Sequence, residues 1–291
     1  MTFAVVGATG KVGRATIRAL RQRGEPVRAV VRDASSAGAL AAAGCEIAVA
    51  DLRDSRALAA ALDGAQAVQV ICPISAQADD AASDMRAVVD SIASALAAAR
   101  PAAVVAISDY GAEVDAGTGV TLIFHHLEAR LRAIPSALTL LRSAEHMQNW
   151  RRHITIATER GILPSLHQPL TKRFPTVSAI DVGVVAADLL VTPHTSAQPR
   201  IVHVEGPRRY TPLDVAAVFR GLVGREVVAR EVPRAEWIPA LMRGGLSDSY
   251  AGLVAELFEA HNAGRIDAEA GVGEIRRGTT ELADVIGGFG A

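Results

Sequence analysis

Three glycines near the start of the chain have the spacing of a turn that holds phosphate groups. Gly7, Gly10 and Gly13 follow the apolar run Phe3 to Val6, and an amphipathic segment begins at Lys11. The free amide groups at the beginning of a helix bind anions, and glycine lets the backbone come close to them. A strand, such a turn and a helix form the fingerprint of dinucleotide-binding proteins. The residues predicted to bind a dinucleotide here are Gly7, Thr9, Gly10, Lys11, Val12 and Gly13.

Arg32 directly follows the second predicted strand, Val27 to Val31. In dinucleotide-binding sheets the residue at this place faces the adenosine ribose, where an acidic side chain selects NAD and an arginine accommodates the 2'-phosphate of NADP. With Lys11 as a second cation, the sequence predicts NADP as the cofactor, with NADPH preferred over NADH. The alternative is that Arg32 is a solvated surface residue and that Asp33 caps the next turn.

Two further strand ends supply candidate cofactor contacts. Asp51 and Leu52 follow the third apolar run, where the carboxylate could accept a hydrogen bond from the adenine amino group and the leucine could cover the ring. The alternative makes Asp51 a cap of its own loop, although Asp54 already has the position of a helix cap. After the fourth run, Cys72, Pro73 and Ile74 are expected to pass along the nicotinamide half through backbone and shape.

Several short motifs occur in an order that resembles a known family. They read GATGKVG, AVVRD, ADLRD, LEARLR, LTLLRSAEHMQN, AIDVGVVAADLL and VHVEGPRRYTPLDVA. Together they resemble the NmrA-like branch of the atypical short-chain dehydrogenases/reductases over nearly the whole chain. The resemblance implies a Rossmann domain with a small substrate lobe and NAD(P) binding. It also implies either a reductase or a redox-sensing regulator without turnover.

The chain departs from the catalytic pattern of short-chain dehydrogenases. Those enzymes use a serine after the fifth strand and a Tyr-x-x-x-Lys pair, because a nearby cation lowers the pKa of the phenol for proton transfer. Ser108 is in place, but Leu122 and His126 stand where the tyrosine and the lysine would be. Tyr110 and His126 are therefore the candidate replacements for catalysis, with Ser108 and His126 also as cofactor contacts. The alternative is that His126 and its neighbour His125 are ordinary helix residues.

The segment RSAEHMQNW, residues 142–150, corresponds to a stretch that lines the cleft between cofactor and substrate lobe in the resembling family. Phe174, before Pro175, could close the opposite wall. The predicted substrate contacts are therefore Tyr110, His146, Met147, Asn149, Trp150 and Phe174. The other histidines have no metal-ligand spacing, so no metal site is predicted.

These residues must be positioned by alternating strands and helices, which predict an α/β fold with a doubly wound parallel Rossmann sheet and a smaller C-terminal α/β lobe. The predicted strands are 3–6, 27–31, 46–50, 67–72, 102–107 and 137–141. The predicted helices between them are 11–23, 36–43, 55–63 with Asp54 as cap, 78–100 and 119–133. We expect an NAD(P)-binding domain over 1–152 and a substrate or partner lobe over 153–291, from which 176–206 returns to the sheet.

The second half is less regular. We expect a helix over 178–191 capped by Asp181, a strand over 200–205, and a helix that begins with the capping box of Thr211 and ends at Gly224. Two more helices are expected near 247–262 and 280–286.

Composition narrows the possible functions. Among 291 residues, 30 Lys and Arg balance 31 Asp and Glu, so no direct binding to nucleic acid or to a membrane surface is expected. Cys45 and Cys72 both lie in apolar runs and are expected to be buried. No apolar stretch of about 18 residues and no signal peptide is evident, which favours a cytoplasmic protein.

The sequence therefore leads to a primary hypothesis and two alternatives. The first is an NADPH-dependent reductase that transfers a hydride to a small, largely apolar carbonyl, quinone or imine. The second is a non-catalytic NADP(H)-binding sensor that acts on a protein partner. A lyase or epimerase that keeps NAD bound is less favoured because Arg32 points to the phosphorylated cofactor. A homodimer is compatible with each.

Overall fold

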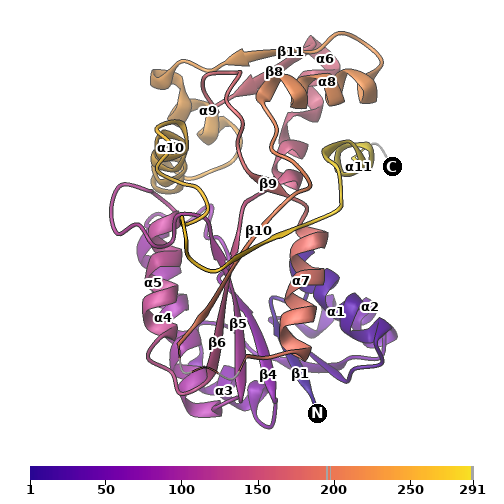
Figure 1. Ribbon diagram of the computed structural model, residues 1–291, viewed down its shortest axis with the longest axis vertical. Coiled ribbons are helices and arrows are strands. Elements are labelled where there is room, and N and C mark those ends of the chain that lie inside the picture. The colour runs from indigo at the N-terminus through magenta and orange to yellow at the C-terminus, as the bar shows by residue number, and fades with distance from the viewer. Residues whose placement is uncertain (195, 197, 290–291) are drawn as a thin grey trace.

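The computed structural model describes residues 1–194, 196 and 198–289. Within these residues, the centre is an eight-stranded parallel sheet of order β12-β10-β6-β5-β4-β1-β2-β3 (Figure 1). Its strands are β1 (Phe3–Val6), β2 (Val27–Val31), β3 (Glu46–Val49), β4 (Ala67–Ile71), β5 (Ala103–Asp109), β6 (Ala137–Ser143), β10 (Arg200–Glu205) and β12 (Glu274–Arg277). The doubly wound α/β class predicted from the sequence is confirmed.

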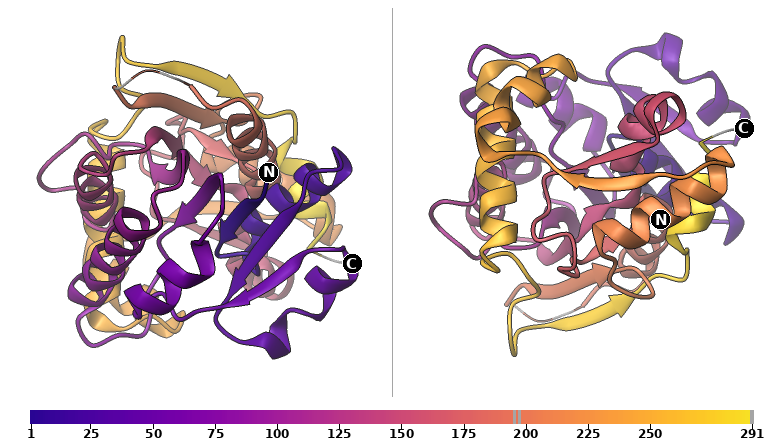
Figure 2. Two further views of the ribbon diagram at one scale, coloured as in Figure 1. Left: turned by 90° about the horizontal axis from the view of Figure 1, so that it is seen from below. Right: turned by 90° about the horizontal axis from the view of Figure 1, so that it is seen from above.

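Helices cover both faces of this sheet, and Figure 2 shows them on its two sides in the view from below. On one face lie α1 (Lys11–Gln22), α2 (Gly38–Ala42) and α7 (Ala179–Val191). On the other lie α3 (Ser55–Leu62), α4 (Ala81–Ala99) and α5 (Thr121–Leu131). Neighbouring residues of β1 alternate between the two cores, with Ala4 in one and Val5 in the other. A strand buried on both faces reads as a continuous apolar run, which is why the sequence revealed these strands.

A smaller upper lobe sits above the carboxyl ends of the strands (Figure 1). Its own apolar core includes Trp150, Phe174 and Phe219. Its elements are η2 (Met147–His153), α6 (Ile154–Arg160), β8 (Ile162–Ser165), α8 (Pro212–Val223), β11 (Val228–Glu231) and α11 (Leu282–Gly287). The remaining short or connecting elements are η1 (Ala34–Ser36), β7 (Glu145–His146), β9 (Thr176–Val177), η3 (Arg234–Glu236), α9 (Trp237–Arg243) and α10 (Asp248–Asn262).

One predicted helix cap is wrong. The residue that caps α7 is Ser178, whose hydroxyl accepts a hydrogen bond from the amide of Ile180. Asp181 instead accepts hydrogen bonds from the amide and hydroxyl of Thr280, 3.0 and 2.8 Å away, and thereby ties α7 to the segment before α11. Local spacing could not reveal this contact because its partners are 99 residues apart. The cap of α3 by Asp54 and the capping box of Thr211 are confirmed.

The edge strand β12 was not predicted. It reads Glu-Ile-Arg-Arg and is mostly exposed, so it lacks the apolar run that marks the buried strands. It forms a strand because it pairs with β10. Among the described residues, no helix is both long and apolar enough to cross a membrane.

Candidate active site

The glycine turn between β1 and α1 has no room for side chains at two positions. Gly7 has φ of +74°, and a Cβ atom on it would lie 2.5 Å from Cγ2 of Ile71. A Cβ atom on Gly13 would lie 2.3 Å from the carbonyl oxygen of Gly7. No side chain caps the N-terminus of α1, whose first turn contains no acidic residue. The turn thus leaves helix amides free beside a positive helix dipole, which fits a pyrophosphate.

The two predicted cations, Lys11 within this turn and Arg32 after β2, are both exposed. Arg32 follows β2, and among the described residues neither Arg32 nor Lys11 forms an ion pair. Asp33 accepts a hydrogen bond from the amide of Ser35, and that bond lowers the pKa of its carboxyl. Arg32 is therefore available for a phosphate, while Asp33 caps the turn as the alternative reading proposed.

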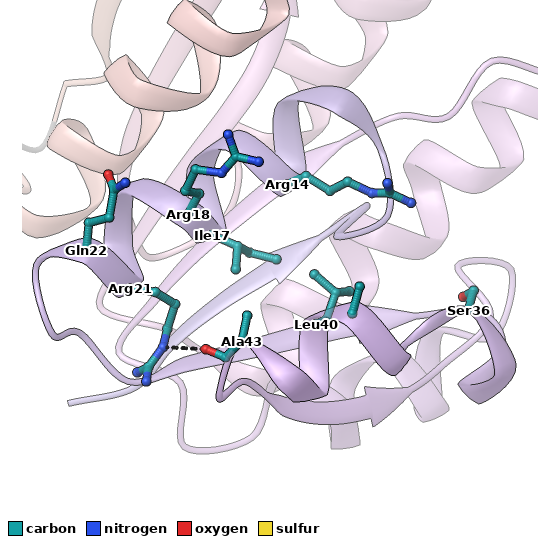
Figure 3. Close-up of a pocket in the computed structure, with 9 residues that line it drawn as sticks. Arg14, Ile17, Arg18, Arg21, Gln22, Ser36, Leu40 and Ala43 are labelled. Carbon is teal, nitrogen blue, oxygen red and sulfur yellow. Dashed lines mark hydrogen bonds between the residues drawn. The ribbon is translucent and has the colours of Figure 1, made fainter. Parts of the chain in front are cut away.

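A cationic groove runs beside the turn, between α1 and α2, with a volume of about 450 Å³ (Figure 3). Arg14 and Arg18 extend from α1, and Arg21 donates from Nε to the carbonyl oxygen of Ala43. Arg14 lies in the first turn of α1 and is a cation that the sequence analysis missed. Its signal was its position directly after Gly13, beside the predicted phosphate site.

The loops after β3 and β4 place the other predicted cofactor contacts. Asp51 accepts a hydrogen bond from the amide of Arg53 at 2.9 Å, which is the loop-capping arrangement of the alternative reading, and Leu52 is half-buried. Cys72 is buried, and burial raises the pKa of its thiol to about 12. Pro73 and Ile74 are exposed. The cysteine thus contributes shape rather than thiolate chemistry.

A central pocket of about 200 Å³ opens at the carboxyl ends of β4, β5 and β6. It also receives side chains from α5, η2 and α10. The residues of this central pocket are Ile71, Cys72, Ile74, Ile107, Ser108, Asp109, Val120, Phe124, Ser143, Ala144, Glu145, His146, Asn149, Tyr250, Leu257, Phe258 and His261. In parallel α/β sheets the carboxyl ends of the strands are where ligands bind.

Asp109, the last residue of β5, lies in the central pocket. Its Oδ2 accepts a hydrogen bond from the hydroxyl of Thr121 at 2.8 Å. Burial raises the pKa of its carboxyl to about 7, and the nearby carboxylates of Glu145 and Glu113 act in the same direction. A carboxyl group that titrates near neutrality can donate a proton at physiological pH. Asp109 was not among the residues predicted from the sequence, although both of its neighbours, Ser108 and Tyr110, were.

Ser108 also lines the central pocket, but its hydroxyl proton is committed elsewhere. It donates to Oε1 of Glu128 at 2.7 Å. Glu128 in turn accepts from Nε and Nη2 of Arg142, 2.9 and 2.8 Å away, and all three residues are buried. This buried ion pair holds Ser108 in place, which favours a positioning role over proton donation to a substrate.

The other predicted catalytic residues lie outside the central pocket. Tyr110 is 1% exposed and packs edge-on against the ring of His203, with 5.4 Å between the ring centroids. Burial raises the pKa of its phenol. Nε2 of His126 lies 3.0 Å from Oδ1 of Asp90 on α4, and Nδ1 of His125 lies 2.9 Å from the carbonyl oxygen of Ala112. The α5 side chain that reaches the central pocket from this stretch is Phe124.

The predicted substrate contacts divide into two groups. His146 and Asn149 line the central pocket. Burial lowers the pKa of His146 to about 4, with a smaller contribution from Lys11, so its imidazole is neutral at pH 7. Met147, Trp150 and Phe174 belong instead to the upper-lobe core, where each is at most 3% exposed. These three side chains support the wall rather than face the pocket.

Helix α10 supplies a wall of the central pocket that was not predicted from the sequence. The four side chains it contributes to the central pocket are Tyr250, Leu257, Phe258 and His261. Burial lowers the pKa of His261 to about 4 and raises that of Tyr250 to about 12, so both are neutral at pH 7. Phe258 packs edge-on against His167, whose Nε2 lies 2.8 Å from Oε2 of Glu145. This pairing holds the pKa of Glu145 near 2 despite its burial.

Comparisons with known proteins agree with this architecture. The model of the NmrA-like family matches residues 1–275, which confirms the resemblance seen in the motifs. The NAD(P)H azoreductase of Xenophilus azovorans is 28% identical over 263 residues, covering 87% of this chain and 85% of the azoreductase. A structure of the NADPH-dependent quinone oxidoreductase from Escherichia coli in complex with NADPH has a TM-score of 0.83 at 22% identity and full coverage of both chains. A structure of NmrA, a negative transcriptional regulator, has a TM-score of 0.68 at 18% identity, with 89% of this chain and 83% of NmrA covered.

Proposed function

The chain belongs to the NmrA-like family, and we propose that it is an NADPH-dependent oxidoreductase that reduces a small, largely apolar acceptor such as a quinone, a carbonyl or an imine. One observation carries the proposal: a titratable carboxyl group, Asp109, lies in a pocket at the same end of the sheet as the glycine turn. The carboxyl group in the pocket suits proton transfer, and the glycine turn suits the binding of a dinucleotide.

The proposed binding of NADPH uses residues along one edge of the sheet. The free amides of Lys11, Val12 and Gly13 hold the pyrophosphate, and Arg32 holds the 2'-phosphate. The central pocket receives the nicotinamide, against Ile71, Ile107 and Cys72. When bound, NADPH supplies the hydride, while the protein supplies orientation and a site with little water.

Asp109 supplies the proton in this proposal. An acceptor that gains a hydride on carbon gains negative charge on its oxygen or nitrogen, and the protonated carboxyl of Asp109 donates its proton to that atom. The hydroxyl of Thr121 donates a hydrogen bond to Oδ2 of Asp109, which orients the carboxyl group in the central pocket. Water then returns a proton to Asp109 for the next cycle. This assignment takes the proton-donor role from Tyr110 and His126, which do not line the central pocket.

The relatives support the same chemistry. Their names describe an NAD(P)H azoreductase and an NADPH-dependent quinone oxidoreductase, both of which reduce unsaturated acceptors with a nicotinamide cofactor. We further propose that residues 1–152 form the NAD(P)-binding domain and residues 153–291 the substrate or partner lobe, from which α7 and β10 return to the sheet. We also propose that the protein is cytoplasmic and that it forms a homodimer or binds a protein partner.

The test is single-turnover oxidation of bound NADPH. Purified protein loaded with one equivalent of NADPH is mixed with quinones, aldehydes, ketones, imines and azo compounds, and the nicotinamide absorbance is followed. We expect oxidation by at least one class. Tight NADPH binding with no oxidation by any acceptor would favour the sensor, for which the specific observation is that Leu122 and His126 replace the catalytic tyrosine and lysine.

A further inference from the structure

A second pocket of about 480 Å³ lies in the upper lobe beside the central pocket. The two share walls: η2 contributes Asn149 to the central pocket and Arg152 to the second, and the segment at the start of α10 contributes Tyr250 to the first and Leu246 to the second. The lining residues of the second pocket are Arg152, His153, Ile156, Pro164, Leu166, Val232, Glu236, Ala240, Leu241, Arg243, Gly244 and Leu246. Its volume is within the range of small-molecule sites.

The guanidinium group of Arg152 is hydrogen-bonded through Nε and not through its two terminal nitrogen atoms among the described residues. Its Nε donates to Nε2 of His153 at 3.1 Å, and the His153 ring lies 5.4 Å from the ring of Trp150, centroid to centroid. Burial lowers the pKa of His153 to about 3, so its ring is neutral and can accept this hydrogen bond. Across the part of the chain that the structure describes, neither Nη1 nor Nη2 of Arg152 has a hydrogen-bond partner within the protein.

The charge balance around Arg152 leaves it without a carboxylate partner. The carboxylate of Glu145 attracts the positive charge of Arg152, but Glu145 is already paired with His167. Of the residues that line the second pocket, Arg152 and Arg243 are cationic, Glu236 is the one acidic residue, and His153 is neutral, which gives a net charge of +1. No ion pair to either arginine occurs among the described residues. Arg152 lines the second pocket and is exposed, so an anionic ligand can reach the free end of its guanidinium group.

The rest of the second pocket is apolar. Ile156, Leu166 and Leu241 are among the side chains that could cover a planar ring, while the free guanidinium fork matches the two oxygens of a carboxylate or sulfonate. We propose that this pocket binds the distal part of the acceptor, and that the acceptor is a planar aromatic compound carrying an anionic substituent recognised by Arg152. The inference rests on the proposed reductase function, because it names the substrate class of that site.

A matched pair of ligands tests the inference without any turnover. Naphthalene-2-sulfonate and the neutral naphthalene-2-sulfonamide are titrated into the NADP-loaded protein, and their affinities are measured by calorimetry. Since charge-assisted hydrogen bonds favour the anion, we expect the sulfonate to bind at least about tenfold more tightly in the native protein. Arg152→Gln should reduce this preference to about twofold or less.

Arg151→Gln is the control, because Arg151 is exposed like its neighbour Arg152 but does not line the second pocket. Its Cζ atom lies 5.9 Å from the ring centroid of Phe289. It should keep the full preference. Equal affinities of the two ligands for the native protein, or a preference that survives Arg152→Gln, would overturn the inference.

The kinetic counterpart compares 1,4-naphthoquinone-2-sulfonate with 1,4-naphthoquinone as acceptors. The ratio of their kcat/KM values should fall about tenfold in Arg152→Gln, mainly through KM. If neither quinone nor any other acceptor is reduced while the Arg152-dependent binding persists, the reductase proposal fails and the anion site stands. If both quinones are reduced with an unchanged ratio in the variant, the reductase proposal stands and the anion site fails.

Discussion

The glycine turn and the central pocket are built in opposite ways. The turn takes its geometry from seven consecutive residues, 7–13, and would present backbone amides to its ligand. The central pocket takes side chains from segments as distant in sequence as Ile71, Asp109, His146 and His261. Changes in the turn should therefore weaken cofactor binding for every acceptor, whereas changes in the pocket should alter the chemistry while leaving cofactor binding largely intact.

The largest expected effect separates the two regions most clearly. Asp109→Asn removes the proposed proton donor, so kcat should fall by about a hundredfold or more. NADPH affinity should change by less than about threefold, because the cofactor is held mainly at the turn. Asp115→Asn, an exposed aspartate in the loop that follows β5, is the control and should behave as the native protein.

The pH dependence of the same variant sharpens the assignment. The protonated carboxyl is the active form, so native kcat should be highest below pH 7 and decline as pH rises through about 7. Stability should follow the same group: between its ordinary pKa of 3.8 and about 7, the folded protein holds a proton that the unfolded chain releases. The free energy of unfolding therefore decreases as pH rises across this window, and Asp109→Asn removes that part of the decrease. A native kcat–pH profile without this decline would exclude Asp109 as the acid.

In the turn, Gly13→Ala introduces a Cβ atom 2.3 Å from the carbonyl oxygen of Gly7. The first turn of α1 has to move, and we expect the Kd for NADPH to rise about a hundredfold, which corresponds to about 2.7 kcal/mol. Gly221→Ala on α8 is the matched control, since a Cβ atom there meets no atom within 4 Å. Similar affinities of the two variants, measured by calorimetry, would contradict the assignment of the turn.

A smaller effect concerns the choice between cofactors. Arg32→Ala should weaken NADPH binding at least about tenfold because a charge-assisted contact to the 2'-phosphate is lost. NADH binding should change little. Arg56→Ala is the control, because Arg56 is an exposed arginine on α3 and is not one of the predicted cofactor contacts. An equal loss for NADPH and NADH would remove the assignment of Arg32.

The smallest effects are expected at residues that the sequence favoured and the structure places outside the central pocket. Tyr110→Phe removes a buried hydroxyl that has no hydrogen-bond partner among the described residues, so its thermal unfolding temperature should be unchanged or slightly higher. His126→Ala breaks the contact with Asp90 at the surface of α4 and α5. We expect kcat within about twofold of native for both variants. A large loss in either would return the proton-donor role to that residue.

The sequence revealed what depends on local spacing. The glycine turn, the buried strands and the caps at Asp54 and Thr211 each follow from neighbouring residues, and the structure contains all of them. It did not reveal β12, whose strand conformation depends on pairing with β10, or the contact of Asp181 with Thr280.

The candidate site was predicted in part for the same reason. His146 and Asn149, two of the predicted substrate contacts, follow β6 and line the central pocket. The sequence could not show which of Ser108, Asp109 and Tyr110 is the proton donor. That role depends on the face of the sheet that each side chain takes and on distant partners such as Glu128 and His203. The role of Tyr250 and Phe258 depends on where α10 packs, which no local pattern encodes.

The most direct test of the account is a crystal structure of the protein with NADPH bound. We predict the pyrophosphate at the amides of residues 11–13, the 2'-phosphate beside Arg32, and the nicotinamide in the central pocket with the Asp109 carboxyl facing the acceptor space. A nicotinamide bound outside the central pocket, or a pyrophosphate away from the glycine turn, would contradict it.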